Sequence, residues 1–72
     1  MKNEIIERVN GLNKVYITLW DSEEIRRTET GMFSARYFVY GMKRAEKERA
    51  ELLRLSAEEG YPNAVCTLRE II

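Results

Sequence analysis

Residues 34–60, SARYFVYGMKRAEKERAELLRLSAEEG, form the most regular stretch of this chain. The stretch predicts one long helix over residues 35–59, because Ser34 is a good N-cap and Gly60 suits the left-handed position that ends a helix. Pro62 follows shortly afterwards and prevents the helix from continuing. At 1.5 Å per residue, such a helix would be about 38 Å long.

One side of the predicted helix is apolar and is expected to cover a sheet. This side carries Ala35, Phe38, Met42, Ala45, Leu52, Leu53 and Ser56. Arg49 projects into the middle of the same stripe. We expect Arg49 either to lie along the surface with its charged end in water or to meet a carboxylate. The candidate carboxylates are Glu29, Glu46 and Glu70.

Three further segments are predicted to be strands. Residues 14–20 alternate, with Val15, Ile17 and Leu19 on one face and Tyr16, Thr18 and Trp20 on the other. After a polar turn at residues 21–24, residues 25–30 are expected to return as an edge strand. Residues 64–71 alternate again and predict the last strand.

Residues 4–9 fit two structures. As a strand they lead into Asn10-Gly11, a dipeptide typical of a two-residue hairpin turn. The hairpin would pair Val9 with Leu12, Glu7 with Lys14 and Ile6 with Val15, and these favourable pairs make the strand our preferred interpretation. As a short helix, the segment would begin at Asn3 and end at Gly11.

The predicted order of elements is strand, strand, strand, helix, strand, which indicates a single two-layer α+β domain over residues 1–72. We expect a small antiparallel, partly mixed sheet covered by one long helix. The same order occurs among unrelated small proteins, including DNA-binding modules and phage-encoded accessory proteins. It therefore decides nothing about function.

Composition narrows the possible functions. The chain has 12 basic and 12 acidic residues and no His. Without His, the commonest acid–base catalyst and metal ligand is missing, so we expect no enzyme, no metal site and no cofactor. No apolar run reaches the ~18 residues of a membrane span, and the N-terminus lacks the apolar centre of a signal peptide. With the single Cys66, this predicts a soluble cytoplasmic protein.

The sheet face opposite the helix is the candidate binding surface. Tyr, Trp and Arg on an uncovered apolar face are typical of protein interfaces. The sequence thus predicts a small accessory or inhibitor-type protein that occupies a partner's surface. The candidate partner-binding residues are Tyr16, Trp20, Ile25, Arg27 and Arg49.

Nucleic-acid binding is the alternative function. Tyr16, Trp20, Arg26 and Arg27 could stack bases and contact phosphates on the same face. Because the positive and negative charges of the chain cancel, no overall field attracts nucleic acid. This interpretation therefore ranks second, after a protein partner.

A homodimer is a further expectation. A helix of about 38 Å would overhang strands of about 23 Å, and the exposed overhang would need a partner. Basic residues near the start of the predicted helix and acidic residues near its end favour an antiparallel mate. The candidate dimer residues are Arg36, Gly41, Arg44, Glu58 and Glu59, and the sheet face with Trp20 is the competing dimer surface.

Overall fold

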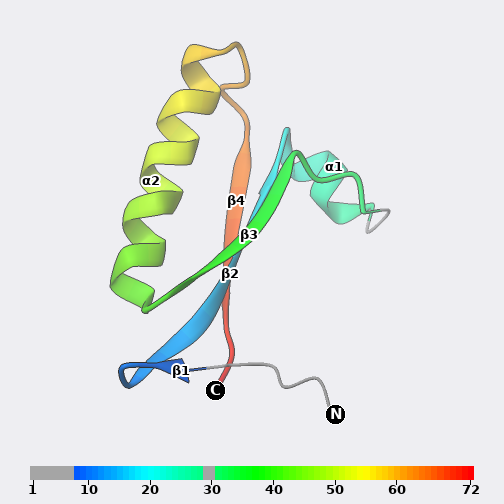
Figure 1. Cartoon of the computed structure of the whole chain (residues 1–72). Helices are drawn as coiled ribbons and strands as arrows, with labels where there is room; N and C mark the ends of the chain where they lie inside the picture. Colours follow the sequence, from blue (N-terminus) through cyan, green and yellow to red (C-terminus); the bar gives the residue numbers. More distant parts are fainter. Residues whose placement is uncertain (1–7, 29–30) are drawn as a thin grey trace.

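The computed structural model describes residues 8–28 and 31–72 of the chain (Figure 1). Its elements in chain order are β1 (Arg8–Val9), β2 (Leu12–Trp20), α1 (Glu23–Arg27), β3 (Ala35–Tyr40), α2 (Met42–Glu58) and β4 (Val65–Glu70). A small antiparallel sheet lies against one long helix. The predicted α+β class and the order of strands about the long helix are therefore confirmed.

Strand β2 is the centre of the sheet. β3 pairs with one side of β2 and β4 with the other, both antiparallel, while β1 pairs with the start of β2. In this register Ile17 lies opposite Tyr37 on β3 and Leu68 on β4. Since β3 and β4 each run antiparallel to β2, they are parallel to one another, and α2 connects them.

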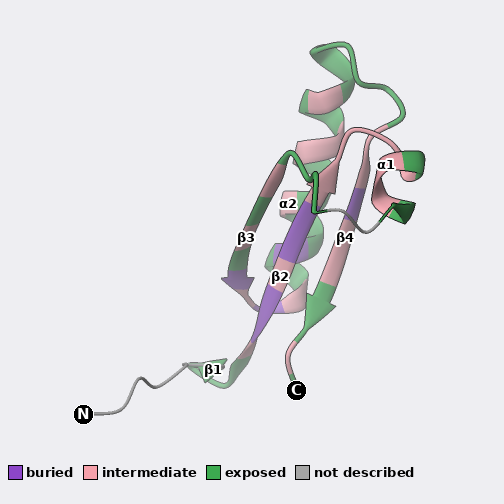
Figure 2. Ribbon diagram, turned by 90° about the vertical axis from the view of Figure 1, so that its right-hand side faces the viewer, coloured by how far each residue is buried: buried purple, intermediate pink, exposed green. Residues whose placement is uncertain are grey.

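The core lies between the sheet and α2. Val15 and Ile17 of β2 are fully buried. Val39, Ala45 and Cys66 complete the buried cluster, and Met42, Leu52 and Leu53 of α2 pack against it. Figure 1 shows α2 along one face of the sheet, and Figure 2 shows the buried residues concentrated on β2 and its neighbours. The core therefore occupies one face of β2 only.

The prediction of one helix over residues 35–59 is wrong in its first part. Residues 35–40 form β3, and α2 begins only at Met42. Gly41 separates the two elements with φ of +99°, a backbone conformation that glycine adopts without strain. The sequence ARYFVY alternates and is rich in aromatic and β-branched side chains, so it fits a strand better than a helix.

The predicted strand over residues 25–30 is also wrong. Glu23–Arg27 form the short helix α1, and residues 29 and 30 lie outside the described part. Ser22 begins this helix, because its hydroxyl accepts a hydrogen bond from the Ile25 N–H at 3.2 Å. The third strand of the sheet is therefore β3, and Ile25 and Arg27 do not belong to the sheet.

The predicted hairpin at Asn10-Gly11 is confirmed. Both residues have positive φ, 53° for Asn10 and 78° for Gly11, as a two-residue hairpin turn requires. Val9 lies opposite Leu12, as expected. Residues 4–7, with the expected pairs of Ile6 and Glu7, lie outside the described part. The strand predicted over residues 64–71 is confirmed as β4.

Arg49 lies on α2 with an exposed side chain. Among the described residues it forms no ion pair, so neither Glu46 nor Glu70 neutralises it; Glu29 lies outside them. Burial raises the pKa of the nearby Cys66 thiol, and the positive charge of Arg49 partly opposes this rise. Arg49 thus behaves as the surface alternative predicted, with its charged end in water.

A hydrogen bond links β3 to α2. The Tyr37 hydroxyl donates to Glu48 Oε1 at 2.7 Å. Burial, and then the Glu48 carboxylate, raise the pKa of Tyr37 from 10.0 to about 12. Because the folded-state pKa is the higher one, the associated stability is complete below pH 10 and is lost as the pH rises towards 12.

Replacing Tyr37 by Phe tests this link. We expect Tyr37→Phe to lower the free energy of unfolding at neutral pH by about 1 kcal/mol, the typical contribution of one hydrogen bond. The variant should also lose less stability than the wild type between pH 10 and 12. Urea denaturation across this range measures both effects, with the exposed Tyr61→Phe as control. Identical pH profiles for wild type and Tyr37→Phe would contradict the assignment.

Gly41 provides a second stability test. A Cβ at this position would keep the unfavourable positive φ and would lie 3.3 Å from Leu12 Cδ1. We expect Gly41→Ala to reduce the free energy of unfolding by about 1–2 kcal/mol, mainly because of the backbone conformation. The double variant Leu12→Ala, Gly41→Ala removes the contact but not the strain. If the double variant is as stable as Leu12→Ala alone, the loss in Gly41→Ala comes from the steric contact with Leu12 and not from the positive φ.

Candidate ligand-binding face

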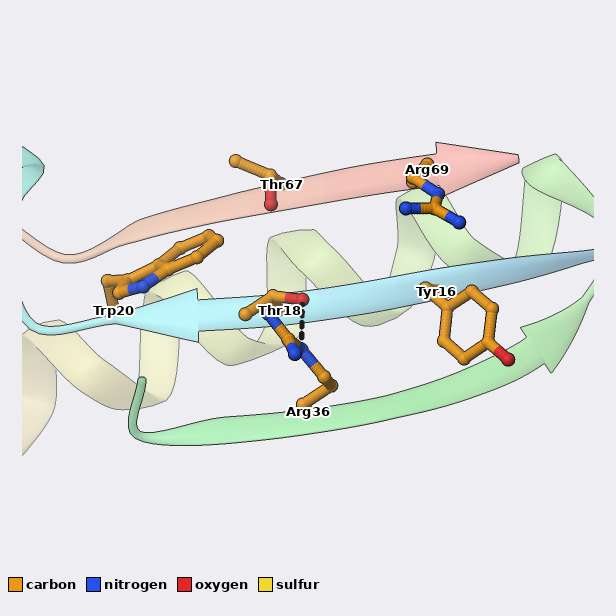
Figure 3. A pocket seen from close by; sticks show the side chains of 6 residues that line it. All are labelled: Tyr16, Thr18, Trp20, Arg36, Thr67 and Arg69. Carbon is orange, nitrogen blue, oxygen red and sulfur yellow. Dashed lines mark hydrogen bonds between the residues drawn. The ribbon is translucent and has the colours of Figure 1, made fainter. Parts of the chain in front are cut away.

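The sheet face opposite α2 is the candidate site, and we call it the open face. Its side chains are Lys14, Tyr16, Thr18 and Trp20 from β2, Arg36, Phe38 and Tyr40 from β3, and Val65, Thr67 and Arg69 from β4. Figure 3 looks onto this face, with α2 behind the sheet. The predicted separation of Val15, Ile17 and Leu19 from Tyr16, Thr18 and Trp20 is therefore confirmed.

A shallow hollow of about 380 Å³ lies on the open face, and we call it the first hollow. It is lined by Tyr16, Thr18, Trp20, Arg36, Thr67 and Arg69. Thr18 is only 6% exposed and forms the floor. Arg36 folds back from β3, and its Nε donates to Thr18 Oγ1 at 3.2 Å (Figure 3). The hollow thus has aromatic rings along β2 and an arginine on each flanking strand.

The open face carries positive charge without negative charge. Lys14, Arg36 and Arg69 form no ion pair with any described carboxylate, because the ion pairs of the described residues lie within α1 and α2. None of the residues that make up the open face is acidic. The face therefore has a local charge of about +3 although the whole chain is neutral.

Aromatic rings hold these cations in place. The Lys14 ammonium lies 4.3 Å from the centroid of the Phe38 ring, and the Arg36 guanidinium lies 4.2 Å from that of Phe33. Arg69 lies 5.9 Å from the Tyr16 ring. Cation–π contacts of this kind attract a cation without cancelling its charge. Arg36 and Arg69 are thus positioned and remain exposed, whereas Lys14 is only 6% exposed.

A second hollow of about 560 Å³ adjoins the first. It is lined by Trp20, Arg26, Arg27, Gly31 and Arg36. Trp20 and Arg36 line both hollows, so the two form a continuous surface from the middle of β2 to α1.

The structure brings together some of the residues predicted as a partner-binding site. Tyr16 and Trp20 line the first hollow, and Trp20 and Arg27 line the second. Ile25 is half-buried in α1, and Arg49 lies on α2, away from the open face. The predicted group of five is therefore not one continuous surface.

Sequence reasoning missed the cations of the neighbouring strands. The helix predicted over residues 35–59 includes Arg36 and Phe38, so these two residues were not expected on the sheet face. Thr67 and Arg69 were on a correctly predicted strand, and their alternation with Cys66 and Leu68 was the available signal. Which strand pairs with β2 could not be read from that alternation.

The residues proposed for a homodimer do not form the expected helix surface. Arg36 lies on β3 and Gly41 precedes α2, whereas Arg44, Glu58 and Glu59 belong to α2 or its end. With 17 residues, α2 is about 26 Å long, whereas the nine residues of β2 span about 30 Å. α2 is therefore shorter than the predicted helix and no longer than β2, although its C-terminal end extends beyond the strands in Figure 1, and the homodimer itself stays a prediction.

The described residues offer little catalytic chemistry. They contain no cluster of three His, Cys, Asp or Glu side chains that could hold a metal ion. Cys66 is buried, and this burial raises the pKa of its thiol, which disfavours the reactive thiolate. No helix among residues 8–28 and 31–72 is long and apolar enough to cross a membrane.

Comparisons with protein-family models, with curated proteins and with solved structures give no match to this chain. A functional assignment therefore depends on the charges and rings of the open face.

Proposed function

We propose that the protein is a non-enzymatic binding module whose open face binds single-stranded nucleic acid. The observation that supports this best is the pair of exposed arginines Arg36 and Arg69, together with the nearly buried Lys14, which adds to the positive charge. They have no carboxylate partner among the described residues and lie beside aromatic rings.

Single-stranded nucleic acid requires both kinds of group on one surface. Its phosphates attract arginine and lysine, and its unpaired bases stack on aromatic rings. Tyr16 and Trp20 are four residues apart on β2, a distance of about 13 Å along the strand. Arg36 and Arg69 lie on the two strands that flank them. A nucleic-acid strand along β2 could therefore stack on both rings while its phosphates meet the arginines.

The distribution of charge supports this proposal even though the net charge of the whole chain is zero. Glu23 contacts Arg26 and Arg27 on α1, and Glu51 and Glu58 contact Arg54 on α2. These acidic groups are thus partnered away from the first hollow. A ligand responds to the potential near its binding surface, and at the open face that potential is positive.

A protein partner is the second candidate, as the sequence predicts. Exposed apolar side chains favour it, since Met32 is 71% exposed and Phe38 is 45% exposed. Apolar groups beside Trp and Arg are typical of protein interfaces. In this case the protein would be an accessory or inhibitor-type module that covers an acidic partner surface. A cytoplasmic location suits either candidate, because the free Cys66 is compatible with a reducing compartment.

Fluorescence of Trp20 tests the proposed function directly. We expect a single-stranded oligothymidylate to change the emission of Trp20 and to bind more tightly than a duplex, because a duplex hides its base faces. Binding should weaken with salt, with a slope of log K against log salt of about −1.4 for two phosphate contacts, one from each exposed arginine. Absence of salt-dependent binding would contradict the proposal and leave the protein-partner candidate.

Variants identify the surface that binds. Arg36→Ala and Arg69→Ala should each reduce the salt slope by about 0.7, the contribution of one phosphate contact to a single strand. Tyr16→Ala should weaken binding about 5- to 150-fold, the range expected when one base loses its stacking partner. Lys43→Ala, on the exposed surface of α2, is the matched control and should leave affinity unchanged. Equal losses in Lys43→Ala and Arg36→Ala would exclude the open face as the site.

A further inference from the structure

Strand β3 forms one border of the sheet. β2 lies between β3 and β4, and no strand of the described residues pairs with the outer side of β3 (Figure 2). We propose that this outer edge pairs antiparallel with the β3 edge of a second copy of the chain, so that the two sheets join into one. The pairing goes beyond the proposed function and does not depend on it.

The backbone groups of β3 alternate between β2 and the outer edge. The Gly41 N–H donates to the Asn13 carbonyl at 2.8 Å, so Gly41 is bonded to β2. Because peptide groups of a strand point alternately to its two sides, Tyr37 is also bonded to β2, whereas the N–H and C=O of Arg36 and Phe38 point outward. Within the described residues, no hydrogen bond uses these four outward groups. They are available to a further strand.

The side chains of β3 leave its outer edge without a projecting charge. Strand edges are commonly protected from self-pairing by charged side chains or by proline. β3 contains no proline, and Arg36, its one charged residue, turns towards β2, where its Nε donates to Thr18 Oγ1 at 3.2 Å (Figure 3). Phe38 is 45% exposed and adds apolar surface. Two β3 edges can therefore approach one another without repulsion.

Pairing centred on Tyr37 satisfies the outward groups. In this register Tyr37 lies opposite Tyr37 of the second copy, and Arg36 lies opposite Phe38 of the second copy. An antiparallel pair that exchanges N–H and C=O groups makes two hydrogen bonds, so the two Arg36–Phe38 pairs make four. Opposite residues of an antiparallel pair point to the same face of the sheet. Both copies of α2 therefore lie on one side of the joined sheet and both open faces on the other.

Charges on α2 favour a second copy as the partner. Glu48 accepts the hydrogen bond from Tyr37 at 2.7 Å. Burial is the main cause that raises the pKa of Tyr37, and the positive charge of the nearby Arg44 acts against this rise. Arg44 is exposed and forms no ion pair with a described residue. Two-fold symmetry about Tyr37 brings Arg44 towards Glu48 of the second copy, and this contact occurs twice.

The proposed interface is small. Each copy contributes one strand of six residues and a few side chains of α2, which is less surface than a permanent dimer buries. We therefore expect reversible association with a dissociation constant in the micromolar range.

Sedimentation equilibrium measures the association, and amide hydrogen exchange observed by NMR locates the interface. As the protein concentration rises through the dissociation constant, the amides of Arg36 and Phe38 should exchange more slowly. Those of Tyr37 and Val39, which are bonded to β2 already, should change less. A chain that remains monomeric at millimolar concentration would contradict the proposal. A dimer in which neither outward amide gains protection would also contradict it.

Proline variants test the hydrogen bonds. Phe38→Pro removes an outward N–H without removing a bond to β2, so it should weaken the dimer at least about tenfold, and Phe38→Ala should weaken it less. Glu70→Pro is the matched control on the opposite edge, where the Ile71 N–H donates to the Lys14 carbonyl and the Glu70 N–H points outward. It should leave the dissociation constant unchanged. Circular dichroism shows whether each variant is folded. Equal losses in Phe38→Pro and either of the other two variants would exclude the β3 pairing.

Charge reversal tests whether the partner is a second copy in the proposed orientation. Glu48→Arg should weaken the dimer about tenfold, because two contacts between opposite charges become repulsive. Adding Arg44→Glu should restore most of this loss, and since both variants lack the bond to Tyr37, their difference reports the charge alone. Arg49→Glu is the control, because Arg49 lies near Cys66 of β4, and it should change nothing. If the double variant associates no better than Glu48→Arg, the proposed orientation is wrong.

Discussion

The whole structure depends on strand β2, because its two faces lie in different environments. Its odd-numbered side chains, Val15 and Ile17, are completely buried beneath α2. Its even-numbered side chains face the other way, and Lys14 and Thr18 are also nearly buried there. Because side chains alternate along a strand, a shift of β2 by one residue would exchange the apolar and polar sets. The alternation of β2 therefore determines which face α2 covers and which face is left uncovered.

The side chains of the open face contribute to stability as well as to the proposed binding. The rings of Tyr16 and Phe38 pack edge to face at 5.8 Å, and the Lys14 ammonium lies near both rings. These contacts bury apolar surface in a domain of only 72 residues, whose main core is small. Lys14 is nearly buried by these contacts, whereas Arg36 and Arg69 remain exposed. A face that contributes to folding in this way is already organised before a ligand arrives, which lowers the entropic cost of binding.

The charges of the chain fall into two groups with different surroundings. On α1 and α2 the acidic and basic residues are three or four positions apart and pair within their own helix. Arg36 and Arg69 are on separate strands and have no acidic residue opposite them, since Arg36 pairs with Thr18 and Arg69 with Tyr16 in the sheet. A neutral total thus coexists with a positive face. The overall charge of the chain therefore does not describe the local charge of the open face.

The sequence by itself determined the elements whose signals are local. The alternation of residues 14–20, the Asn10-Gly11 turn, the end of α2 before Pro62 and the α+β class are all confirmed. Only the tertiary structure decided residues 35–40 and 23–27. Apolar residues at 35, 38 and 42 fit a helix, but pairing with β2 stabilises residues 35–40 as a strand, and Gly41 permits the break. The open face has the same origin, because Arg36 and Arg69 come to lie on one face, on either side of β2, only when β3 and β4 pair with its opposite edges.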